Sequence, residues 1–317
     1  MKENRREQLF NSITDVDERF IEEAQTEMRR KKSHRAVRWV GLAACLCLVA
    51  GGALLWSEFH QPSGANDGPA IVTGEGVAIP PRVLDVQNNT SEANMIAFFI
   101  YQGRWYEHYA FVDMNENLVG EYLGTATGSI DKWSEKDEYV ELSGSVQGDF
   151  YAVNGYDPNF MLCKRSGIDG ELSLYICNNG ITLSRGSELY EDRLHLAENY
   201  RGVQYESQDS WYYSKGELHP LDASDHKALT DFIGALNDAA FILRQDVPFD
   251  KDKDVEAVSV FDSCLYHLYF QMEDGITVHL RLIEGGYVFF DGMMDVAVRI
   301  PPEAFDPLIE QLAANEK

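Results

Sequence analysis

The longest uncharged apolar run in the chain predicts a membrane span. Trp39–Trp56 holds eighteen residues without a charged side chain, and a helix of that length would measure about 27 Å, close to the ~30 Å hydrocarbon core of a bilayer. The run also resembles a cleaved secretion signal, or a lipobox ending at Cys45. A charged segment of 38 residues precedes the run, which is long for a secretion signal. Lipidation at Cys45 would leave the apolar second half of the run without a role. We therefore expect one transmembrane helix over 39–56.

Residues 1–38 show the spacing of an amphipathic helix. Apolar side chains recur at Val16, Phe20, Ile21 and Ala24, after a candidate N-cap at Thr14 or Asp15. Acidic residues come early and basic residues late, which suits the helix dipole. Because a helix of about 20 residues is marginal alone in water, its apolar stripe predicts a binding partner.

Two stretches near the N-terminus carry a family resemblance. LFNSITDVDERFIEEA, with the basic cluster behind it, and RWVGLAACLCLV are similar to the N-termini of single-pass, anti-sigma-factor-like proteins of clostridial-type bacteria. The resemblance covers the first ~50 of 317 residues. It implies that the stripe binds a cytosolic sigma factor or another regulatory protein. The His-x-x-x-Cys-x-x-Cys zinc pattern of one anti-sigma class is absent from the sequence.

The pattern changes beyond the apolar run. Residues 57–92 are rich in Gly and Pro and predict a flexible linker. Short β-branched and aromatic runs then alternate with turn clusters, which predicts an extracytoplasmic β-rich antiparallel domain over 93–190.

Residues 191–317 combine helical and strand patterns, so we expect an extracytoplasmic α+β domain there. Two stripes have helical spacing: Leu229, Phe232, Ile233, Leu236 and Ala240, and Phe305, Leu308, Ile309 and Leu312. The fold class expected for the whole chain is α+β: a short cytosolic helix, a transmembrane helix, a β-rich domain and a mixed domain.

A hairpin between the two stripes has a predictable register. With a three-residue loop over 273–275, Phe270 opposes Val278 and Leu268 opposes Leu280, which places apolar side chains on one face. A two-residue loop would set Phe270 against His279. We therefore expect the longer loop, with Gly275 in a left-handed conformation.

Charge divides unevenly along the chain. Residues 1–38 hold ten basic and eight acidic side chains, so the remainder holds 17 basic and 44 acidic ones. The basic cluster before the apolar run predicts a cytosolic N-terminus and an extracellular C-terminal region at the cell membrane. So acidic a surface repels nucleic acid, and direct nucleic-acid binding is not expected.

Catalytic and metal-binding motifs are absent from the sequence. It has no phosphate loop, zinc helix or nucleophile elbow, and two loops that resemble calcium sites, starting at Asp113 and Asp250, lack the required Gly and Glu. In the hairpin register above, His267 and His279 share the polar face, where we expect solvated positions. We therefore predict no enzyme activity, cofactor or metal.

Aromatic clusters are the stronger functional lead, although burial in a core is the alternative for each. Rigid aromatic side chains grip sugars or peptides at low entropic cost. The candidates for an extracellular ligand are Trp105, Tyr106, Tyr109, Trp211, Tyr212 and Tyr213. Cys163 and Cys177 either form a disulfide or, with Cys264, remain as free buried thiols.

Two functions fit these patterns. The first is a single-pass membrane regulator with an outer sensor or scaffold and an inner helix that holds a cytosolic partner. The second is a surface-anchored binding module for cell-wall glycan or protein.

Overall fold

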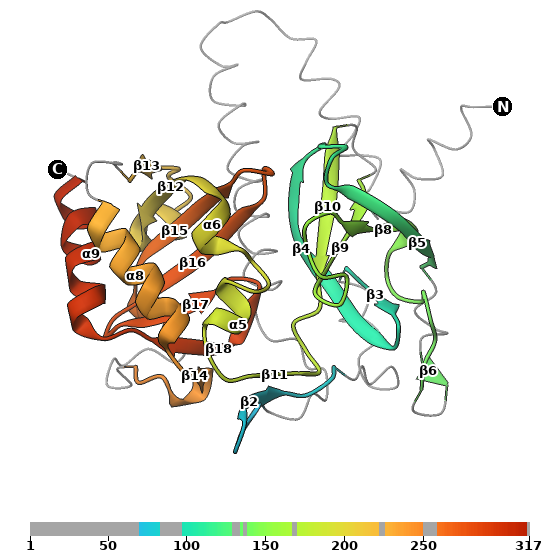
Figure 1. Cartoon of the computed structure of the whole chain (residues 1–317), viewed down its shortest axis with the longest axis horizontal. Helices are drawn as coiled ribbons and strands as arrows, with labels where there is room; N and C mark the ends of the chain where they lie inside the picture. The colour runs from blue at the N-terminus through green and yellow to red at the C-terminus, as the bar shows by residue number, and fades with distance from the viewer. Residues whose placement is uncertain are drawn as a thin grey trace, which may run out of the picture. The chain divides into compact units, whose positions relative to one another are not determined.

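Strands dominate the part of the chain that the structure describes. The computed structural model describes residues 70–82, 97–128, 134–135, 138–166, 170–221, 226–249 and 259–315. The chain divides into two compact units, 1–58 and 59–317, and all described residues belong to the second (Figure 1). The predicted cytosolic helix and membrane span, 1–38 and 39–56, lie outside the described residues.

The first large sheet has six strands, all paired antiparallel (Figure 1). In spatial order they are β3 (Phe98–Tyr101), β4 (Arg104–Asp113), β10 (Glu171–Ile176), β9 (Met161–Arg165), β8 (Gln147–Val153) and β5 (Val119–Thr127). Residues 140–146 join its two edges: Leu142 donates to the carbonyl of Ile100 and accepts from the amide of Thr127, at 2.8 and 3.0 Å. The sheet therefore curls around its own apolar side chains, among them the stacked rings of Phe99 and Phe150.

Two smaller sheets consist of short strands. β1 (Ile71–Thr73), β2 (Gly76–Ile79) and β11 (Ile181–Leu183) form one, and β6 (Ser134–Glu135) and β7 (Glu138–Tyr139) form the other.

The second large sheet has seven antiparallel strands. In spatial order they are β13 (His219–Pro220), β12 (Tyr200–Ser207), β15 (Cys264–Met272), β16 (Thr277–Ile283), β17 (Tyr287–Phe290), β18 (Met293–Arg299) and β14 (Phe241–Leu243). Short helices flank it: α5 (Ser187–Tyr190), α6 (Leu196–Asn199), α7 (Gln208–Tyr212), η3 (Arg244–Asp246) and η4 (Val260–Ser263).

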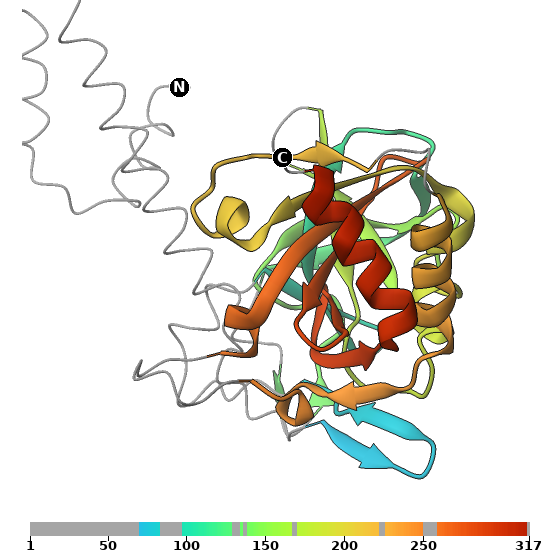
Figure 2. The same ribbon diagram turned by 90° about the vertical axis from the view of Figure 1, so that its left-hand side faces the viewer.

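Both predicted helices of this region are present and cover one face of the sheet. They are α8 (His226–Asp238) and α9 (Pro302–Asn315). Figure 2 shows α9 crossing in front of the strands with α8 beside it. Their stripes pack on alternate residues of the central strands, such as Leu268, Phe270 and Leu280, which are 0% exposed. Burying such side chains stabilises the fold by roughly 1.5–3 kcal/mol each.

The predicted hairpin register is confirmed. Phe270 pairs with Val278 and Leu268 with Leu280, the amide of Met272 donates to the carbonyl of Ile276, and Gly275 has φ +98°. A one-residue slip would have turned the apolar set away from the helices.

A single cluster of buried side chains takes in members on both sides of residue 190, the predicted domain boundary. The turn of the β15–β16 hairpin is held against the six-stranded sheet by three side-chain hydrogen bonds. They run from Tyr156 to the Asp274 carboxylate, from Asn115 to the Asp274 carbonyl and from Tyr109 to the Thr277 carbonyl.

The predicted fold class is wrong. Strands take 46% of the described residues and helices 23%, so the fold is β-rich rather than a mixed α+β fold. Helical periodicity in 191–317 is confined to two stripes, while the remaining apolar residues mostly alternate with the period of two that builds sheets. The predicted transmembrane helix, 39–56, is not among the described residues, and within the described ranges no helix is long and apolar enough to cross a membrane. The longest, α9, spans 14 residues, about 21 Å against the ~30 Å required.

Candidate functional site

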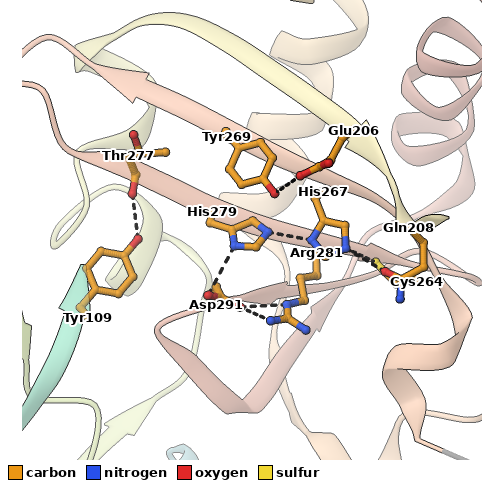
Figure 3. A network of polar contacts seen from close by, with 10 residues as sticks. All are labelled: Tyr109, Glu206, Gln208, Cys264, His267, Tyr269, Thr277, His279, Arg281 and Asp291. Atoms are coloured by element: carbon orange, nitrogen blue, oxygen red, sulfur yellow. Dashed lines mark hydrogen bonds and ion pairs between the residues drawn. The ribbon is translucent and has the colours of Figure 1, made fainter. Parts of the chain in front are cut away.

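The two faces of the seven-stranded sheet differ in chemistry. Alternate residues point to opposite faces, so the register that turns Leu268 and Leu280 toward the helices turns His267, Tyr269, His279 and Arg281 to the other side. That side carries a network of polar and charged side chains, drawn in Figure 3.

Helix α7 lies against this polar face and begins at an N-cap. The Ser207 side chain accepts from the amide of Ser210 at 3.3 Å, a bond that satisfies one free amide of the first turn. The Ser210 hydroxyl in turn donates to the buried Glu206 carboxylate at 2.7 Å. Tyr269 donates to the other Glu206 oxygen at 2.6 Å. Glu206 thus joins α7 to β15.

Two histidines form the centre of the network. His267 Nδ1 and His279 Nε2 lie 2.8 Å apart, and His267 Nε2 lies 2.8 Å from Gln208 Oε1 on α7. On its far side, His279 Nδ1 faces an oxygen of Asp291 at 3.4 Å. The four side chains form one continuous chain from Asp291 to α7 (Figure 3).

Arg281 and Trp211 complete the contact between helix and sheet. The Arg281 guanidinium donates through Nε to Asp291 at 2.8 Å, and through Nη2 to the same oxygen. Its Cζ lies 4.7 Å from the centre of the Trp211 ring and 5.3 Å from that of Phe261, within the range of cation–π attraction. Trp211 also stacks on His267, with ring centres 4.6 Å apart.

The network is almost fully buried, which contradicts the predicted solvated positions of its histidines. His267 is 0% exposed and Arg281 is 4% exposed, and the His279 side chain is 12% exposed. Burial lowers the pKa of His267 to about 2, helped by the nearby His279 and Arg281. Burial and the neighbouring Glu206 raise the pKa of Tyr269. His267 is therefore neutral and Tyr269 remains a hydrogen-bond donor at neutral pH.

A cysteine beside the histidine pair lacks the features of a nucleophile. Cys264 Sγ lies 3.6 Å from His267 Nε2, but that nitrogen already contacts Gln208. Burial raises the pKa of Cys264 to about 12, so the thiol stays protonated, whereas a reactive cysteine needs a thiolate. Cys163, Cys177 and Cys264 are free and buried, so the structure contains no Cys163–Cys177 disulfide.

Metal coordination finds no support at this site. Among the described residues, no group of three or more His, Cys, Asp or Glu side chains is arranged to hold a metal ion. A shallow groove of about 480 Å³ lies elsewhere, between α8 and the end of β18, and is lined by Asp231, Asp238 and Arg299 among others. No residue of the polar network lines this groove.

The candidate aromatics of the first sheet are largely enclosed. Trp105 and Tyr106 are each 1% exposed. Trp105 stacks on Phe98, and Tyr106 donates to the carbonyl of Pro158. Tyr109 packs on Phe290, and its hydroxyl bonds to the hairpin.

The candidates at the end of α7 divide sharply. Trp211 is half-buried against the network, whereas Tyr212 and Tyr213 are 63% and 65% exposed. The tyrosine rings meet edge to face, with centres 5.1 Å apart and planes at 87°. The candidates of the N-terminal helix, Val16, Phe20, Ile21 and Ala24, lie outside the described residues.

Sequence reasoning missed Glu206, Gln208 and Asp291, which complete the network. The hairpin register placed the two histidines, Tyr269 and Arg281 on one face, but only burial of that face makes protein partners necessary. Because the sequence does not show that burial, it held no signal for these three partners.

Comparison of the chain with protein-family models, curated proteins and solved structures produced no match.

Proposed function

We propose that this chain is a regulatory protein, not an enzyme, and that its folded part is a recognition module whose binding surface is the exposed end of α7. The observation that carries the proposal is the contrast between three consecutive aromatic residues. Trp211 anchors the helix in the polar network, while Tyr212 and Tyr213 stand in solvent.

The network has the features of a scaffold. Both ring nitrogens of His267 are occupied by protein partners, its pKa is held near 2, and the Cys264 thiol beside it is protonated. These groups attach α7 firmly to β15 and β16, which limits the entropy that the tyrosines lose when a ligand binds. Rigid exposed aromatics with few rotatable bonds are favoured at recognition surfaces for this reason.

The resemblance at the N-terminus supports a regulatory role. In the anti-sigma-like arrangement, the stripe of Phe20 and Ile21 would bind a sigma factor, while the folded module responds to a signal. Burying Phe20 against a partner would contribute about 2 kcal/mol, which corresponds to a roughly thirtyfold change in affinity.

Transcript profiling in the host tests this proposal. A strain without the chain is compared with strains that carry Phe20→Asp, the double variant Tyr212→Ala/Tyr213→Ala, or Tyr122→Ala. Tyr122 is the matched control because it is a tyrosine on β5 that is 54% exposed.

We expect Phe20→Asp to change the same transcripts as deletion and the Tyr212/Tyr213 variant to change an overlapping set. Tyr122→Ala should match the wild type, with equal protein abundance in all variant strains. The proposal is rejected if deletion leaves transcription unchanged, or if the Tyr212/Tyr213 variant behaves like the control.

The alternative, a cell-wall glycan module, receives less support from the same residues. A sugar ring stacks best on a flat aromatic platform, but the two tyrosine planes are nearly perpendicular.

A further inference from the structure

The tyrosine pair already has a cation beside it. Lys215 Nζ lies 5.8 Å from the centre of the Tyr213 ring, inside the ~6 Å range of cation–π attraction. The backbone holds Lys215 there: Ser214 has φ +50°, and the amide of Lys215 donates to the carbonyl of Ser210 at 2.9 Å. The chain turns back at Ser214 and returns the ammonium group to the ring.

The electrostatic surroundings favour positive ligands. Asp209 and Glu217, at the two ends of this segment, are exposed, and the chain has a net charge of −25. Such a surface attracts basic groups and repels anionic polymers. Leu218 adds apolar surface nearby in the chain, at 47% exposure, which suits a ligand longer than a single ammonium ion.

We infer that Tyr212 and Tyr213 form a docking site for a basic protein segment, in which a Lys or Arg side chain takes the position that Lys215 holds over Tyr213. The inference rests on the proposed recognition function and names the chemistry of the partner. Lys215 acts as an internal competitor that the partner displaces.

Peptide binding to the full-length protein tests the inference. The probes are a fluorescent peptide of alternating Lys and Gly residues and its Glu–Gly counterpart, with affinity read by anisotropy at low salt and at 0.15 M salt. We expect Tyr213→Ala to weaken the basic peptide about threefold to fivefold, the range expected for an exposed cation–π contact. Tyr213→Phe should stay close to wild type, because it keeps the aromatic face.

Tyr213→Leu separates cation–π attraction from plain apolar contact. We expect it to bind as weakly as Tyr213→Ala, since leucine has no aromatic face. Tyr122→Ala should bind like the wild type. The inference is overturned if the Leu and Phe variants bind the basic peptide equally well. It is also overturned if Tyr213→Ala and Tyr122→Ala lose the same affinity for that peptide.

The internal competitor supplies an independent test. Lys215→Gln should tighten binding by about twofold or more beyond the effect of Lys227→Gln. Lys227 is a suitable control because its side chain is 82% exposed on α8 and its replacement changes the net charge equally. Equal effects of the two substitutions would mean that only net charge matters, which also overturns the inference.

Failure here is distinguishable from failure of the proposed function. If the Tyr212/Tyr213 variant alters transcription but the tyrosines contribute nothing to basic-peptide binding, the recognition surface stands and the basic partner is rejected. Tyrosine-dependent binding of the Glu–Gly peptide would likewise reject a basic partner.

Discussion

His267 Nδ1 and His279 Nε2 lie 2.8 Å apart, although the two residues are diagonal neighbours rather than register partners on β15 and β16. Their other contacts determine the direction of the bond. Because Gln208 Oε1 accepts from His267 Nε2, the neutral ring of His267 has its proton there, and its Nδ1 accepts from His279. The donor order therefore runs from His279 through His267 to Gln208, and the Asp291 carboxylate lies 3.4 Å from the other nitrogen of His279.

Acid should destabilise the fold through His267. Its pKa falls from 6.5 to about 2 on folding, so between those values the unfolded chain binds a proton that the folded chain does not. This contribution to stability is complete above pH 6.5 and is lost as the pH falls, by about 1.4 kcal/mol per pH unit.

Urea unfolding between pH 7 and pH 5 measures this effect. Below pH 6.5, the free energy of unfolding should depend less steeply on pH in His267→Gln, by about 1.4 kcal/mol per pH unit. His108→Gln is a useful comparison, because burial lowers the pKa of His108 to about 4, and it should reduce the slope in the same direction. An unchanged slope in His267→Gln would show that His267 is not held neutral by the fold.

Removing Arg281 should be costly because it leaves a buried carboxylate without its cation. Arg281→Met should lower the free energy of unfolding by roughly 3–5 kcal/mol. Adding Asp291→Asn should recover part of that loss, which a double-mutant cycle in urea would measure.

The exposed pair between Arg165 and Glu116 provides the control. Arg165→Met removes the same kind of group from the surface, and we expect a far smaller loss there because solvent screens the pair. Additive effects of Arg281→Met and Asp291→Asn would contradict a coupled buried pair.

Two glycines should respond in opposite directions to alanine. A Cβ at Gly275 or at Gly234 would meet nothing within 4 Å, but Gly275 has φ +98° while Gly234 lies within α8. Gly275→Ala should destabilise by about 1 kcal/mol through backbone strain. Gly234→Ala should stabilise by roughly 0.5–1 kcal/mol through helix propensity. Thermal unfolding of both variants shows whether each substitution raises or lowers stability. A change in the same direction for both would exclude backbone conformation as the cause.

Some elements were predictable because local periodicity specifies them. The β15–β16 register followed from alternating apolar residues, since a slip by one residue exposes the whole set. α8 and α9 followed from their apolar stripes. β5 carries no such signal, because Gly120 and Gly124 interrupt its pattern, and its place depends on pairing with β8 and on the bridge through Leu142.

By itself, the sequence determined which side chains share a face: Leu268 with Leu280, and Tyr269 with Arg281. Only the tertiary structure decided what covers each face. His267 and His279 were expected in solvent, but α7 lies about sixty residues before them in the chain and encloses them through Gln208 and Trp211. Side-chain alternation is a local property of the backbone, whereas burial depends on contacts between distant segments, so the same pattern fits a solvated face and a buried network equally well.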